Sequence, residues 1–161
     1  MCWRIGQWRY KGETMTARTG MANPIQRLRE MANVGTADYT LGTVSYWSDD
    51  ALQGVLDRFR MNIVNEPLTP VSTTLVGSAY YYDYYAPVRE YEQGTAYFRI
   101  TNVGGTVITP TEITYEAGHI NFGTANQHGS AYYLNARAFD LNAAASYVWR
   151  AKAANVAAYY D

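Results

Sequence analysis

The chain has 161 residues, which suits one domain of ordinary size with a substantial core, whereas two full domains would be cramped. Thirteen Lys and Arg residues against fourteen Asp and Glu residues leave a formal net charge of -1, so the overall charge predicts neither nucleic-acid binding nor adhesion to a membrane surface. The single cysteine, Cys2, excludes an intramolecular disulfide framework and a cysteine-based zinc site.

We do not expect the first twenty residues to act as a secretion signal, because Arg4, Arg9 and Lys11 interrupt every apolar run. We therefore treat residues 1–20 as an N-terminal extension that need not be ordered, and residues 21–161 as the domain. No stretch of the sequence is long and apolar enough to predict a membrane span. Synthesis in a cytoplasm is the default expectation.

Two short helices are predicted in the first third of the chain. Asn23 as N-cap and Pro24 at the first helical position predict a helix over residues 24–34. A second helix is predicted over residues 48–60, with Ser48 as its cap. Its apolar side chains recur at i, i+3, i+4 and i+7, the spacing of one helix face, and are Leu52, Val55, Leu56 and Phe59.

The period of the apolar residues changes from helical to two after the second helix, which predicts a β insertion at about residues 66–138. Alternating stretches predict a strand over residues 95–103, a hairpin over residues 111–122 and a strand over residues 130–139. We expect at least four strands in an antiparallel meander. Residues 73–88 could add one or two more.

A long helix is predicted from Leu141 to about Tyr159, capped by Asp140. One side of this helix is almost without bulk, and its residues are Ala143, Ala144, Ala151, Ala154 and Ala158. Alanine has the highest helix propensity, so simple helix stability explains the pattern. Close approach of another helix or another copy of the chain explains it equally well. The predicted fold class is α+β, a small helical bundle of two N-terminal helices and a C-terminal helix with an inserted antiparallel, tyrosine-rich β-sheet region.

A run of tyrosines stands at the start of the β region, and its members are Tyr80, Tyr81, Tyr82, Tyr84 and Tyr85. Successive strand residues point to opposite faces, so this run places rings on both faces of a sheet. Both faces cannot be the interior of one small domain, which predicts that something else covers one of them. Tyrosine is enriched at protein interfaces and suits sugar-stacking platforms. A well-filled sheet with some exposed rings is the alternative.

No recognised catalytic constellation is visible, so we predict no enzymatic activity, no cofactor and no metal site. An enzyme would need His119 and His128 to converge with a carboxylate such as Glu116. Both histidines are predicted in turns or at strand edges, where an exposed histidine is far commoner than a metal ligand.

The stretch "GSAYYLNARAFDLNAAASYVWRAKAA" combines a tyrosine- and leucine-bearing strand, an Asp-Leu-Asn-Ala-Ala-Ala cap and an amphipathic helix with Trp and Lys. It resembles the C-terminal part of head-to-tail connector (adaptor) proteins of tailed bacteriophages. The stretch "WSDDALQGVLDRFR" is similar to an early helix of the same family. The resemblance covers about residues 47–60 and 95–158, in pattern rather than by one diagnostic motif.

The resemblance implies a structural virion protein of the neck, made in the host cytoplasm, with no catalytic activity. It implies a homo-oligomeric ring, commonly of twelve copies, that binds beneath the portal protein and continues the DNA channel to the stopper or tail-completion protein. Double-stranded DNA would pass without specific binding, which suits residues 61–136, where six acidic residues outnumber two basic ones. Relatives carry a polar tail after the last helix, whereas this chain stops at Asp161. Either the native chain is longer or another element docks on the portal.

The surface implied to meet a neighbouring subunit or the portal lies on the last helix, and its residues are Ala144, Tyr147, Trp149, Arg150, Ala151, Ala154 and Ala158. The tyrosine run is a second candidate interface. We expect Ala144→Glu or Ala154→Glu to block assembly more than folding. The alternative function is a glycan- or protein-binding β module of a phage tail or surface protein, with the tyrosine run as its platform.

Overall fold

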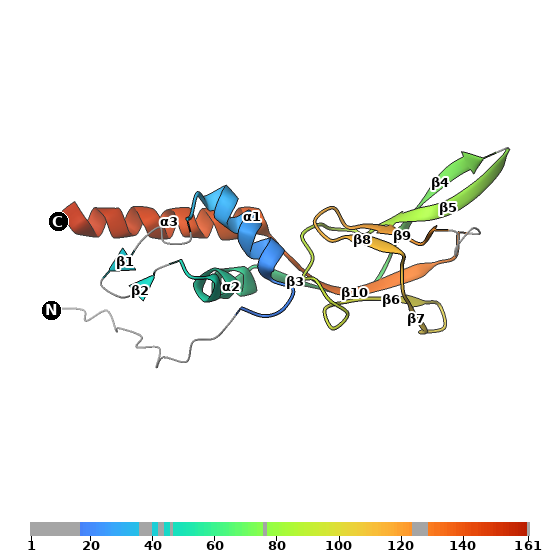
Figure 1. The fold of residues 1–161 in the computed structure, drawn as a ribbon, viewed down its shortest axis with the longest axis horizontal. Helices are drawn as coiled ribbons and strands as arrows, with labels where there is room; N and C mark the ends of the chain where they lie inside the picture. The colour runs from blue at the N-terminus through green and yellow to red at the C-terminus, as the bar shows by residue number, and fades with distance from the viewer. Residues whose placement is uncertain are drawn as a thin grey trace.

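The computed structural model describes residues 17–35, 40–41, 44–45, 47–75, 77–123 and 129–160, and only the backbone of residues 40–41, 44–45, 75 and 155–160. The fold is α+β, as predicted. Its described part holds three helices, two antiparallel four-stranded sheets and a two-residue strand pair. Figure 1 shows a long molecule with the helices at one end and the two large sheets at the other.

The helices are α1 (Ala22–Ala32), α2 (Asp49–Arg58) and α3 (Leu141–Tyr160). The strands are β1 (Thr40–Leu41), β2 (Val44–Ser45), β3 (Arg60–Pro67), β4 (Thr69–Leu75), β5 (Ser78–Tyr85), β6 (Phe98–Asn102), β7 (Val107–Ile108), β8 (Glu112–Thr114), β9 (His119–Asn121) and β10 (Tyr132–Phe139). The large sheets are thus inserted between α2 and α3. They begin at Arg60, whereas the sequence predicted a start near residue 66.

The predicted caps of α2 and α3 are confirmed. The Ser48 hydroxyl accepts a hydrogen bond from the Ala51 amide at 3.3 Å, and the Asp140 carboxylate accepts one from the Ala143 amide at 3.0 Å. Each cap satisfies an amide that the first helical turn leaves without an intrahelical partner. Both helices therefore begin where the sequence predicted.

The predicted cap of the first helix is wrong. α1 begins at Ala22, after Met21, without a side-chain cap, so Asn23 already lies in its first turn. The Asn23 amide instead donates to the carboxylate of Glu116, in the turn between β8 and β9. A tertiary partner thus replaces the local one, and the contact ties the start of α1 to the β region.

The three helices bury one mainly aliphatic core. α1 contacts both α2 and α3, and α2 contacts α3. The predicted apolar face of α2 is confirmed, since Leu52, Val55 and Leu56 are buried and Phe59 is partly buried against them. The buried side chains are Met21, Ile25, Leu28, Ala32, Val34, Trp47, Leu52, Val55, Leu56, Phe139, Leu141, Ala144, Ala145 and Val148.

The two large sheets do not form the meander of consecutive strands that the sequence predicted. Their strand orders are β3-β10-β6-β7 and β4-β5-β9-β8, so each sheet mixes early and late strands. The chain passes from one sheet to the other four times, from β3 to β4, from β5 to β6, from β7 to β8 and from β9 to β10. The strand β3 was missed because only Met61 and Ile63 of its side chains are half-buried and the rest are exposed, which leaves a weak period of two.

The facing sides of the two sheets bury a second, aromatic core. Its ring contacts include Tyr84 with Phe122 at 5.3 Å and Tyr91 with Phe98 at 5.1 Å between centroids, both edge to face. The predicted alternation of the last strand is confirmed, since alternate residues of β10 are buried from Tyr132 onward. The buried side chains are Leu68, Tyr84, Tyr91, Phe98, Ile100, Ile120, Phe122, Tyr132, Leu134, Ala136 and Ala138.

The hairpin of β4 and β5 extends beyond its sheet. β5 pairs with β9 only from Asp83 to Tyr85, so the rest of the hairpin lies past the end of β9 and projects from the molecule (Figure 1). We call residues 71–75 and 77–82 the hairpin arm. The side chains of residues 71–74, on β4, are all exposed.

Charged side chains join the two ends of the molecule. Arg18 contacts Asp57 of α2 at 2.7 Å and Glu92 at 3.1 Å, and Arg137 of β10 lies 3.8 Å from Glu92. The Glu92 side chain is fully buried, and a buried carboxylate requires such partners. The Arg18 guanidinium holds the pKa of the Asp57 carboxyl below its usual value, against the opposing effect of burial.

The residues just before α1, which the sequence analysis assigned to the N-terminal extension, make contacts with the β region. The Gly20 carbonyl accepts a hydrogen bond from the Gln93 amide at 3.2 Å. A Cβ at position 20 would lie 2.1 Å from the Gln93 carbonyl oxygen, and the φ of +97° there favours glycine. Residues 1–16, the rest of the predicted extension, lie outside the described residues.

Candidate functional site

The candidate interface predicted on the last helix is built around a face of α3 that the bundle leaves uncovered. Buried Leu141, Ala144, Ala145 and Val148 point into the helical core. The exposed side chains Ser146, Arg150, Ala153 and Ala154 define what we call the outward face of α3. Apart from Arg150, these side chains are small, so another surface could approach the helix closely.

Trp149 forms one flank of the outward face. Its side chain is 48 % exposed although its Nε1 donates to the Met31 carbonyl at the end of α1. The Lys152 ammonium lies 5.2 Å from the Trp149 ring centroid and donates to the carbonyls of Ala32 and Asn33 at 3.3 and 2.8 Å. The lysine thereby satisfies the C-terminal carbonyls of α1, where a cation is favourable, and it holds the indole in place.

Tyr147 forms the other flank. Tyr147 and Trp149 are two residues apart, which separates them by about 200° around the helix axis. Tyr147 therefore lies over α2, whereas Trp149 lies over α1. The Arg58 guanidinium donates to the Tyr147 hydroxyl at 2.6 Å and lies 5.0 Å from the ring centroid. Phe59 contacts the same ring at 6.2 Å between centroids. Tyr147 nevertheless stays 37 % exposed.

The alanines predicted to share one interface lie in different environments, some in the helical core and some on the surface. Ala144 is fully buried in the helical core, so it cannot meet a second molecule without unfolding the bundle. Ala151 is half-buried against the same core, whereas Ala154 is exposed. The Ala158 side chain lies outside the described residues. Simple packing therefore explains Ala144, and the sequence could not decide this because α3 carries small residues on both sides.

The members of the tyrosine run also differ in their burial. Tyr84 is fully buried, and its hydroxyl donates to the Ser130 carbonyl at 2.9 Å, so it serves the core of the sheets. Tyr80 and Tyr82 stack at 5.7 Å between centroids, and both are half-buried. The ring of Tyr81, also half-buried, lies against Gly129, where a Cβ would be 3.0 Å away.

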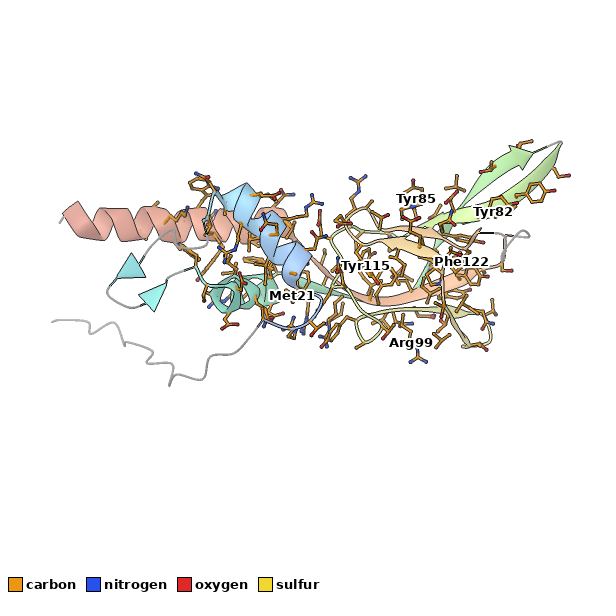
Figure 2. The ribbon with its side chains drawn as sticks, viewed as in Figure 1. Met21, Tyr82, Tyr85, Arg99, Tyr115 and Phe122 are labelled. Atoms are coloured by element: carbon orange, nitrogen blue, oxygen red, sulfur yellow. The ribbon has the colours of Figure 1, made fainter. Side chains whose placement is uncertain are left out.

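Tyr85 is the exposed member of the run, at 46 %, and lies on the outer face of its sheet (Figure 2). Its ring lies 5.1 Å from the His119 ring, which contacts Asp83 at 2.9 Å. The Asn121 amide donates to the same Asp83 oxygen at 2.6 Å. This outer face therefore combines one exposed ring with a histidine, a carboxylate and an amide.

The residues needed for the enzyme alternative have separate partners. His119 pairs with Asp83, and Glu116 accepts from Asn23. His128 lies outside the described residues. Among the described residues, no group of three or more His, Cys, Asp or Glu side chains could hold a metal ion. None of the described helices is both long and apolar enough to cross a membrane.

Sequence reasoning did not identify Met31, Arg58 and Lys152 as neighbours of the predicted interface. Met31 is 39 % exposed beside Trp149, and the basic pair anchors the two aromatic rings. The sequence does contain one relevant signal, because arginine and lysine side chains commonly form cation–π contacts with aromatic side chains. The pairing itself depends on how the helices pack, which the sequence does not reveal.

Comparisons of the chain with models of protein families, with curated proteins and with solved structures found no match. Its function must therefore be inferred from its own residues and their arrangement.

Proposed function

We propose that the chain is a subunit of the head-to-tail connector ring of a tailed bacteriophage, bound beneath the portal and continuing the DNA channel toward the stopper or tail. The observation that carries the proposal is the outward face of α3. Two large aromatic side chains, Trp149 and Tyr147, stay partly open on the two flanks of a face of small residues. Exposed aromatic residues around a closely approachable surface are typical of protein interfaces.

One of the stretches that carry the family resemblance, residues 129–154, runs without a break from a strand into a helix, which supports the proposal. β10 ends at Phe139, Asp140 caps α3, and α3 packs on α1 and α2. The same stretch therefore connects the sheets with the helical bundle. A protein with a helical end and a β end suits a position between two different partners, such as a portal and a tail component.

Few basic side chains on the β end also suit a channel wall. Residues 60–139, which span the two sheets, contain four arginines and no lysine against six acidic residues, and the arginines are Arg60, Arg89, Arg99 and Arg137. Phosphate-binding surfaces need clustered Lys and Arg to neutralise the DNA backbone. DNA would accordingly slide past this region without being held.

The test is cryo-electron microscopy of virions, in which we expect rotationally averaged density for this chain between portal and tail. Assembly of the purified chain with its portal provides the variant test. We expect Trp149→Ala and Ala154→Glu to reduce portal-dependent ring formation at least tenfold. Ala22→Glu, an exposed alanine of α1, is the matched control and should assemble normally. Absence of the chain from the neck, or normal assembly of both interface variants, would refute the proposal.

The outer face around Tyr85 favours a second candidate, a glycan-binding module. An exposed ring beside hydrogen-bonding carboxylate, amide and imidazole groups suits the apolar face and hydroxyls of a sugar. Titration with a panel of host-surface oligosaccharides would show binding that Tyr85→Ala abolishes. This candidate leaves the open aromatic residues of α3 unexplained, which is why we place it second.

A further inference from the structure

A groove opens at the side of the β end where the chain crosses from β7 to β8. Its volume is about 490 Å³, comparable with small-ligand sites and large enough for several side chains of a partner. Its apolar lining comprises Phe98, Ile100, Val107, Ile108, Pro110 and Ile113. Its two charged residues, Arg99 and Glu112, are both exposed, so they border the apolar lining rather than interrupt it.

The hairpin arm projects from the molecule, whereas the groove is recessed, and the arm is uncharged. Residues 67–82, which include the arm, contain no charged residue. Burying such a segment does not require a charge to be desolvated. Val71, at the base of the arm opposite Asp83, and Val107 of the groove are 38 % and 47 % exposed, so each site leaves a large apolar side chain partly open.

The outer edge of the arm also lacks the usual protection of an edge strand. β4 is the last strand of its sheet and its side chains from Val71 to Thr74 are exposed. Edge strands are commonly protected by charged side chains or proline, since their free amides and carbonyls attract other chains. β4 has Pro70 near its start and no charge, which favours a partner that covers the rest of it.

The arm and the groove lie on opposite sides of the β end. β4 and β3, joined directly, form the edges of the two sheets on one side, and β7 and β8, joined by residues 109–111, form the edges on the other. The arm of one molecule therefore cannot fill its own groove without crossing the sheets. A second copy placed beside it can present its arm to that groove.

We infer that the hairpin arm of each copy docks in the β7–β8 groove of the next copy. Because the two surfaces differ and lie on opposite sides, the contact is head to tail, and repetition closes a ring when the rotation per subunit fits. The inference rests on the proposed ring and names the contact between neighbours within it. In this arrangement the β ends make the contacts between copies, and the outward face of α3 contacts the portal.

Cysteine cross-linking between two differently substituted chains tests this contact. In a Cys2→Ser background, one chain carries Thr73→Cys on the arm and the other carries Val107→Cys in the groove. We expect the oxidised mixture to give at least tenfold more disulfide-linked dimer than either chain alone. Val103→Cys, in the turn after β6 and 76 % exposed but outside the groove, is the matched control for Val107→Cys.

Equal cross-linking of Val107→Cys and Val103→Cys with the arm, or none with either, would overturn the inference. Charge insertion gives an independent readout that does not need a disulfide. Val107→Glu should abolish ring formation on the portal while Val103→Glu preserves it. Virion density with a ring of this chain whose arms lie away from neighbouring grooves would disprove the docking and leave the connector function standing, whereas absence of any ring would remove both.

Discussion

The two ends of the molecule bury their cores with different side chains. The helical end uses aliphatic residues and three alanines, so its helices lie close together, and it leaves Tyr147 and Trp149 partly exposed. The β end buries five aromatic residues, four of them in edge-to-face pairs, and leaves valines exposed. Buried rings therefore dominate the core of the β end, whereas the helical end buries Trp47 and Phe139 and leaves Tyr147 and Trp149 partly open.

This difference shows that residue type alone does not locate an interface. Tyr84 and Tyr85 are neighbours in one run, yet the first is fully buried and the second 46 % exposed. Ala144 and Ala154 belong to one helix, yet only the second can meet a partner. In both pairs the position relative to the packed face decides the role.

The largest expected effect separates the two alanines of α3. Ala144→Glu places a carboxylate in the aliphatic core of the helices, which should lower the free energy of unfolding by about 3 kcal/mol or more. Ala154→Glu, the matched control on the exposed side, should cost less than about 0.5 kcal/mol. Urea unfolding measures both.

Hydrogen exchange of Ala144→Glu sharpens the comparison further. We expect amides of α1, α2 and α3 to lose protection before those of β6 and β10, since the two cores are separate clusters. Simultaneous loss in all five elements would show that the two ends unfold as one unit. Equal stability of the two glutamate variants would contradict the packing of α3.

The charged contacts between the two ends predict a pH dependence. Arg18 lowers the folded-state pKa of Asp57, so this contact stabilises the fold above the usual carboxyl pKa of about 4 and is lost as the pH falls through the lowered value. Asp57→Asn should therefore cost about 1 to 2 kcal/mol at neutral pH, and its stability should approach that of the parent below about pH 4.

Thermal unfolding of Asp57→Asn and of the parent should be compared between pH 2 and 7. This range spans the ordinary carboxyl pKa of about 4. Glu66→Gln, an exposed carboxylate on β3, is the control for loss of one charge and should cost less than about 0.5 kcal/mol. A constant difference between Asp57→Asn and the parent across the range would show that the ion pair does not link the two ends.

The smallest expected effect concerns the aromatic core. Tyr84→Phe keeps the ring contacts with Phe122 and removes the hydroxyl that donates to Ser130. Because Ser130 is exposed and water can replace the donor, we expect a loss of about 1 kcal/mol or less in urea unfolding. Tyr85→Phe on the outer face should be neutral. A loss above about 3 kcal/mol, the scale of removing a whole aromatic side chain, would mean that the hydroxyl and not the ring organises this core.

Elements with strong local signals were predictable from the sequence. The cap at Ser48, the apolar face of α2, the alternation of β10 and the cap at Asp140 all follow from residues within one or two turns of each other. The fold class followed from these elements. The hairpin turning near Gly118 was also predictable, because its two strands are adjacent in the sequence.

Features that depend on distant partners were not predictable. β3 pairs with β10 about seventy residues later in the chain, as in the match of Leu134 with Glu66, and its own pattern is weak. Asn23 is of a residue type that often caps helices, but its side-chain amide donates to Glu116 instead. Arg18 carries no local signal, since its role depends on Asp57 and Glu92 meeting across the junction.

The direct passage from β10 through Asp140 into α3 has a mechanical consequence. The strand and the helix follow one another along the length of the molecule, about 26 and 30 Å by their residue spacings (Figure 1). β10 is flanked by β3 and β6, so a pull along α3 loads the hydrogen bonds of both ladders in shear, many at once. A pull on the hairpin arm would instead open the β4–β5 ladder one bond at a time. The long axis is therefore the stiff direction of this molecule, and the arm is its compliant part.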